Sequence, residues 1–184
     1  TTWWDRLYLD ATYYYSWYTD FIGYHLGLRI EDDPGGSAAN RLSSVQAYRI
    51  ASNATEQVTT QGFSLGANYY FARYTLAANY TWNVLNAGED DPIIPAYNTP
   101  EHKYNVSLAG RDLDWKLGKG RCGFNVTYKW VEGFLFEGSP QFTGRIPSYS
   151  LVDAQVSWAK PDQVWQVKLG SSNLLNQKVV QVYG

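Results

Sequence analysis

Polar side chains recur at alternate positions in stretches that are otherwise aromatic or aliphatic. In residues 7–22 the carboxylates Asp10 and Asp20 stand at even positions, while almost all odd positions are apolar or aromatic. Amides and amines repeat this arrangement further along the chain. Such groups on one hydrated surface can form hydrogen bonds with a polar solute or with the water around it. The sequence contains no nucleophile-elbow motif that would indicate a hydrolase. The candidate residues are Asp10, Tyr14, Asp20, Asn79, Asn83, Asn105, Lys129, Asp153, Gln155 and Lys168.

The sequence offers little support for a metal site. The acidic clusters 31–33 and 89–91 are each followed by proline. Clustered carboxylates suit Ca²⁺, but this spacing matches no defined cation loop, and a solvated loop tip is the simpler interpretation. His25 and His102 lie far apart and lack a Cys or carboxylate at metal-ligand spacing. We therefore expect no metal, no cofactor, no catalytic residue and no enzyme activity.

The alternating pattern predicts the elements that position the candidates. A period of two indicates a strand with two unlike faces. Longer connectors are expected at 23–44, 87–102 and 132–148, and shorter ones at 72–74, 111–120 and 159–163. Short turns at one end and long loops at the other are typical of outer-membrane barrels. The seven predicted strands are 7–22, 62–71 (with an upstream extension through 45–57 and a kink near 54–57), 75–85, 103–110, 121–131, 149–158 and 164–172.

The distribution of charge distinguishes the two faces. A charge that faces lipid costs about 2–4 kcal/mol at the middle of the bilayer. Apart from the extension through 45–57, the seven charged residues inside the predicted strands all fall on the polar face, so the other face is predicted to contact lipid. They are Asp10, Asp20, Lys103, Arg121, Lys129, Asp153 and Lys168.

The tryptophans add a second indication, because membrane barrels carry aromatic girdles at both interfaces. Trp3, Trp4, Trp115, Trp158 and Trp165 fall near the short turns, and Trp17, Trp82 and Trp130 fall near the long loops. We expect an all-β, antiparallel, up-and-down transmembrane barrel segment that occupies residues 1–184 as one domain. The polar candidates then line a lumen.

Composition excludes some classes and leaves alternatives open. The net charge of −2 gives no basic footprint for nucleic acid, and no run of apolar residues is long enough for a transmembrane helix. One alternative is a soluble β-rich domain that binds glycan through Trp and Tyr. Aromatics make up 17% of the chain, and inward-facing cores rarely use so many Tyr and Trp, since each buried OH or NH needs a partner.

An odd number of strands raises the question of closure. Bacterial single-chain barrels use even numbers, and an open edge in lipid leaves backbone groups unpaired. The chain is therefore expected to be incomplete or to pair with another chain. The alternative is a small closed barrel, acting as a pore, adhesin or scaffold, with an eighth strand from 45–57 that could also pair as a hairpin of its own.

The run SSNLLNQKVVQVYG at 171–184 resembles the stretch before the last strand of TonB-dependent outer-membrane receptors, especially those of Bacteroidota type. Asn173, Leu174, Asn176 and Lys178 match that pattern, while Leu175 stands where an aromatic residue is usual. The segments 7–23, 49–71 and 75–83 are similar to successive barrel strands of the same family.

The resemblance implies the C-terminal third of a 22-strand barrel, without its final strand, plug domain or TonB-contacting box. It implies nutrient uptake energised through TonB in the bacterial outer membrane, or service as a subunit of a larger outer-membrane complex. The implied partners are the lipid bilayer, the remaining barrel strands and the plug. TonB and a surface lipoprotein or other outer-membrane subunits are further implied partners, and nucleic acid is not.

Overall fold

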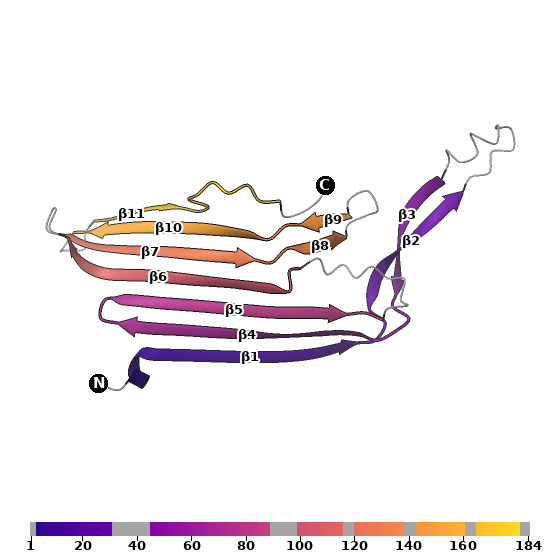
Figure 1. Ribbon diagram of the computed structural model, residues 1–184, viewed down its shortest axis with the longest axis horizontal. Helices are drawn as coiled ribbons and strands as arrows, with labels where there is room; N and C mark the ends of the chain where they lie inside the picture. Colours follow the sequence, from indigo (N-terminus) through magenta and orange to yellow (C-terminus); the bar gives the residue numbers. More distant parts are fainter. Residues whose placement is uncertain are drawn as a thin grey trace.

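The structure is a computed structural model that describes residues 3–30, 45–88, 99–115, 120–137, 143–160 and 165–180. Seven strands form one antiparallel sheet in the order β1-β4-β5-β6-β7-β10-β11 (Figure 1). This confirms the predicted all-β, up-and-down architecture. The strands are β1 (Leu7–Tyr18), β4 (Val58–Phe71), β5 (Tyr74–Asn86), β6 (His102–Trp115), β7 (Gly120–Val131), β10 (Tyr149–Ala159) and β11 (Gln166–Ser171), and the 3-10 helix η1 (Trp3–Arg6) precedes them.

Two small hairpins extend from the end of the sheet opposite the β4–β5 turn (Figure 1). One pairs β2 (Ile22–Ile30) with β3 (Val45–Asn53), and the other pairs β8 (Phe134–Glu137) with β9 (Thr143–Ile146). The expectation that 23–44 and 132–148 are simple loops is therefore wrong. Residues 45–53 pair with β2 outside the main sheet, as a hairpin of their own, and the chain breaks at 54–57 before β4 begins.

The first strand is shorter than predicted because the chain bends after Tyr18. Asp20 adopts a positive φ of 56°, a conformation that Asp tolerates better than most residues. The backbone NH of Ala54 donates to the carbonyl of Phe21 at 2.6 Å, and Ala54 and Val58 are buried against Phe21. This small core fixes the point where the β2–β3 hairpin leaves the sheet.

The register aligns the apolar residues of neighbouring strands across the whole sheet. Leu65 lies opposite both Ala11 and Tyr80, and Val106 lies opposite Ala78 and Tyr128. The phase predicted from alternation therefore agrees with the pairing observed. The ladder shifts once, between Gly110 and Leu113 of β6, where a β-bulge faces β7.

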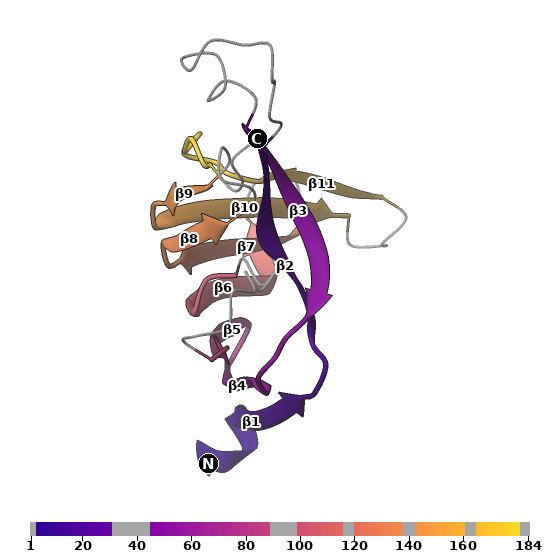
Figure 2. The same ribbon diagram turned by 90° about the vertical axis from the view of Figure 1, so that its right-hand side faces the viewer.

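The sheet is a single layer that is open at both edges. Among the described strands, β1 pairs only with β4 and β11 only with β10. Seen from the long-loop end, the strands follow one another in one layer, and the β2–β3 hairpin rises from the β1 edge toward the level of β10 and β11 (Figure 2). Over the residues described, no helix is long and apolar enough to cross a membrane.

Candidate functional site on the polar face

The register gathers nine of the ten candidate residues on one face of the sheet. Asp10, Asn79, Asn105 and Lys129 lie in one row that crosses five strands through Gly66. The remaining strand residues of the set share this face: Tyr14 and Asn83 meet through Gly62, Asp153 and Gln155 lie on β10, and Lys168 faces Ser157. Asp20 alone stands apart, in the bend after β1. That this face lines a lumen stays a prediction.

Neighbouring groups in the first row already contact each other. The amide of Asn79 donates to the Oδ1 atom of Asn105 at 3.3 Å. Asp10 lies over Gly66, where a Cβ atom would collide with its carboxylate. The absence of a side chain there allows the carboxylate to lie against the backbone. Within this row, Asn79 and Asn105 therefore form a hydrogen-bonded pair, and Asp10 packs against the backbone beside them.

Asn83 has a structural role. Its side chain is 8% exposed, and its amide donates to Thr99 Oγ1 at 3.4 Å and to the carbonyl of Pro100 at 3.5 Å. Its backbone NH donates to the carbonyl of Glu101 at 3.0 Å. Asn83 therefore fastens the segment that enters β6 and offers little surface to a permeant.

Asp153 fastens the segment that follows β11. Its Oδ2 atom accepts a hydrogen bond from Lys129 Nζ at 2.5 Å, and its Oδ1 atom accepts one from the backbone NH of Asn173 at 2.8 Å. Asn173 in turn exchanges side-chain hydrogen bonds with the backbone of Gln177. We call Lys129, Asp153, Asn173 and Gln177 the Asp153 clasp. Part of the motif that carries the family resemblance thus folds back onto β10.

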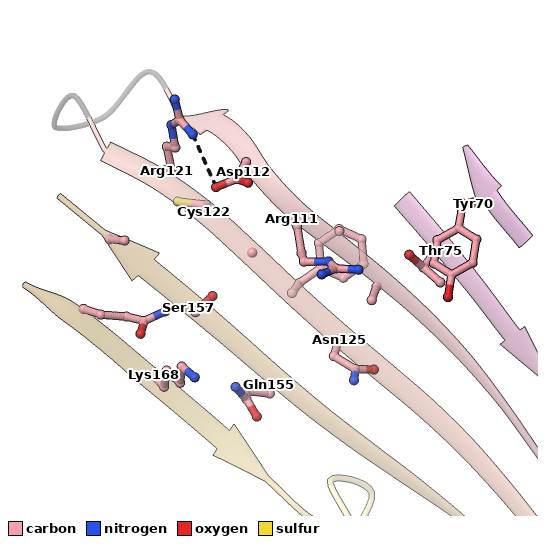
Figure 3. Close-up of a pocket in the computed structure, with 16 residues that line it drawn as sticks. Tyr70, Thr75, Arg111, Asp112, Arg121, Cys122, Asn125, Gln155, Ser157 and Lys168 are labelled. Carbon is pink, nitrogen blue, oxygen red and sulfur yellow. Dashed lines mark ion pairs between the residues drawn. The ribbon is translucent and has the colours of Figure 1, made fainter. Parts of the chain in front are cut away.

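A hollow of about 500 Å³ lies on the polar face near the short turns (Figure 3). Its floor contains the small residues Ala109, Gly123 and Ala159. Around the floor stand cations, one carboxylate, amides and hydroxyls: Arg111, Arg121, Lys168, Asp112, Asn125, Gln155, Ser157, Thr75 and Tyr70. These side chains come from six neighbouring strands, β4, β5, β6, β7, β10 and β11 (Figure 3).

The β-bulge in β6 brings Arg111 and Asp112 to this hollow. Two residues occupy the place where one would face Gly123, and Asp112 adopts a φ of 51°. Arg73 in the β4–β5 turn supports the bulge, since its guanidinium donates to the backbone carbonyl of Asp112 and pairs with Asp114 at 2.9 Å. Asp112 also faces Arg121 at 3.6 Å (Figure 3). Bulges are frequent at barrel rims, where they re-aim side chains.

Arg121 and Lys168 were predicted on the polar face, whereas Arg111 and Asp112 were not, although the sequence carries a signal for their position. The apolar residues of 103–110 stand at even positions, whereas Leu113 and Trp115 stand at odd ones. That change of phase indicates one extra residue in the strand. The predicted connector 111–120 is therefore wrong in its first half, because residues 111–115 form the end of β6.

The opposite face is apolar, and its tryptophans lie near strand ends. Trp17, Trp82, Trp130 and Trp158 all share this face by register, and Trp165 precedes β11. Trp3 and Trp4 belong to η1 and Trp115 ends β6, and the side chains of these three lie outside the described part of the structure. From Cys122 to Trp130 the strand rises roughly 27 Å, close to the height of a barrel's apolar band.

The acidic clusters at 31–33 and 89–91 lie outside the described residues. His25 contacts Ser52, with 2.9 Å between Nδ1 and Oγ, and His102 contacts the hydroxyl of Tyr80 at 2.6 Å. Within the described ranges, no group of three or more His, Cys, Asp or Glu side chains is arranged to hold a metal ion.

Comparisons with known proteins agree with this geometry. A family model described as "TonB dependent receptor-like, beta-barrel" matches residues 1–174. Among solved structures, the FrpB iron transporter from Neisseria meningitidis (F3-3 variant) is similar, with a TM-score of 0.62 and 14% sequence identity. The match covers 95% of this chain and 25% of the transporter chain, and at this identity it concerns the fold alone. No curated protein matches the sequence.

Proposed function

Because the chain belongs to the β-barrel family of TonB-dependent receptors, we propose that it forms part of the wall of an outer-membrane receptor for nutrient uptake. The observation that carries this proposal is the two-faced sheet, in which seven strands share one apolar and one polar face. The chain spans about a quarter of the similar transporter, so ligand binding and uptake belong to the intact receptor.

The apolar face supports a membrane location. Leu65, Val106 and Val126, on inner strands of the sheet, are 48%, 39% and 41% exposed. Contiguous apolar surface of this extent is rare on soluble monomers, and it is the expected surface of a strand that faces lipid. A soluble glycan-binding domain would need a second layer over these residues, and no such layer exists among the described elements.

The polar face is proposed to line the lumen. Its carboxylates and amides, such as those of Asp10, Asn105 and Gln155, would contact the plug or the hydrated permeant. The resemblance of 171–184 to Bacteroidota-type receptors supports a finer version, in which the receptor works with a surface lipoprotein in a larger outer-membrane assembly. TonB would supply the energy through the plug.

Cells that lack the intact receptor and cells that lack TonB test the uptake function. Both strains should fail to deplete the same compound from a defined medium, as measured by mass spectrometry of the spent medium. Restoring the receptor gene should restore depletion only in cells that contain TonB. Depletion that depends on the receptor but not on TonB would favour a passive pore instead.

A further inference from the structure

We propose that the hollow on the polar face is an anion-binding subsite, which takes a carboxylate or phosphate group of the permeant near the short-turn end of the lumen. This inference rests on the proposed uptake function and narrows the class of compound transported. It is carried by the placement of Arg111, Lys168 and Arg121 around a floor that contains the small residues Ala109, Gly123 and Ala159.

The sheet register sets the size of the subsite. One row crosses the strands from the β6 bulge with Arg111, through Gly123 and Ser157, to Lys168. Neighbouring strands lie about 4.8 Å apart, so the two cationic residues start roughly 14 Å from each other. Arginine and lysine side chains can each cover several ångströms of this interval. The remaining gap above Gly123 and Ser157 suits an oxyanion group of a small molecule.

The polar side chains around this gap can all donate hydrogen bonds, and those of Arg111 and Lys168 can only donate. The structure shows no ion pair for Arg111 or Lys168 within its described residues. The hydroxyl of Thr127 donates to Asn125 Oδ1 at 3.3 Å, which leaves the Asn125 amide nitrogen to donate elsewhere. Asn125, Gln155 and Lys168 come from β7, β10 and β11, which are neighbours in the sheet (Figure 3).

Charge favours an anion over a cation. The hollow has three cationic side chains and the single carboxylate of Asp112. Asp112 pairs with Arg121 at 3.6 Å, and both side chains are more than half exposed, so this pair is weak and can rearrange. The Arg73 guanidinium contacts Asp112 and Asp114 of the bulge, and the backbone NH of Arg111 donates to the carbonyl of Arg73 at 2.8 Å. Concave surfaces lined by one sign of charge concentrate ions of the opposite sign.

Isothermal titration of the purified intact receptor in detergent tests the subsite, with citrate and inorganic phosphate as the probes. We expect Arg111→Gln and Lys168→Gln each to raise the Kd of a probe by about fivefold or more, since each removes a charge-assisted hydrogen bond. Lys168→Arg keeps the charge and should bind within about twofold of the unmodified receptor. The ratio of the Kd for citrate to the Kd for phosphate then shows whether the subsite prefers a carboxylate or a phosphate group.

Lys103→Gln is the matched control. Lys103 lies on the same face at the long-loop end, and it is exposed. An equal loss of binding in this variant would show a general charge effect and overturn the proposal. Absence of probe binding, or unchanged binding in Arg111→Gln and Lys168→Gln, would overturn it as well. The proposed uptake function is tested separately. It would fail if cells without the receptor or without TonB still depleted the compound from the medium.

Discussion

At the scale of single residues, many polar side chains of the polar face form hydrogen bonds that stabilise neighbouring segments of the chain. Asp153 accepts hydrogen bonds from Lys129 and from the backbone of Asn173. Asn83 donates hydrogen bonds to the segment before β6. Arg73 holds a bulge instead of standing free. Arg111 and Lys168 form no ion pair within the described residues. Their side chains are therefore better candidates for contact with a permeant.

The Asp153 clasp can be tested by removing its two functions in turn. Asp153→Asn retains an acceptor for Asn173 and loses the charge partner of Lys129, so it should lower the free energy of unfolding by less than about 1 kcal/mol. Asp153→Ala loses both and should cost about 1–2 kcal/mol more. Guanidinium unfolding of the intact receptor measures the difference, with Gln155→Ala as a neighbouring control. Equal effects of the two Asp153 variants would show that the bond to Asn173 is unimportant.

At the scale of elements, each strand contributes alternate residues to two unlike environments. Val126 of β7 lies between Leu108 and Ala154 on the apolar face. Its neighbour Thr127 lies between Ser107 and Asp153 on the polar face, with 2.8 Å between the two hydroxyl oxygens of Ser107 and Thr127. Adjacent positions in one strand therefore allow a comparison that differs only in the face.

Val126→Arg should impair insertion of the intact receptor into lipid vesicles, whereas Thr127→Arg should be tolerated. An arginine on the lipid face near midplane costs about 2–4 kcal/mol, and one on the polar face remains hydrated. The fraction that shows a heat-modifiable shift in gel mobility reports the folding yield. Equal yields would mean that the two faces are wrongly assigned.

The strands could be predicted from sequence because alternation is a local property. Residues 121–131 carry a period of two that β7 reproduces almost to the residue. The β2–β3 hairpin was not predicted, although all even positions of 22–30 are apolar or aromatic. The two glycines of this segment and the run after it, which is rich in Asp, Pro and Gly, are typical of a loop. The contact of Arg73 with Asp112 and Asp114 joins positions far apart in the chain. This contact depends on the β-bulge in β6. The strand propensities of the individual residues could therefore not predict it.

At the scale of the whole molecule, the sheet has two edges that do not match. β1 is twelve residues long and β11 is six. If these strands paired with each other, about half of β1 would remain unpaired. Each unpaired backbone group in hydrocarbon costs several kcal/mol. The structure therefore favours further barrel strands at both edges over direct closure.

This chain alone should consequently fail to form a closed barrel. When it is refolded into lipid vesicles, we expect no heat-modifiable species and no ion conductance, because the free edge of β1 would lie exposed in the bilayer. Supplying the rest of the intact receptor as a second polypeptide should produce a heat-modifiable complex, since the missing strands then cover both edges. A heat-modifiable, conducting species from the chain alone would instead require β1 and the region of β11 to pair. That result would identify a small complete barrel and contradict the larger receptor wall proposed above.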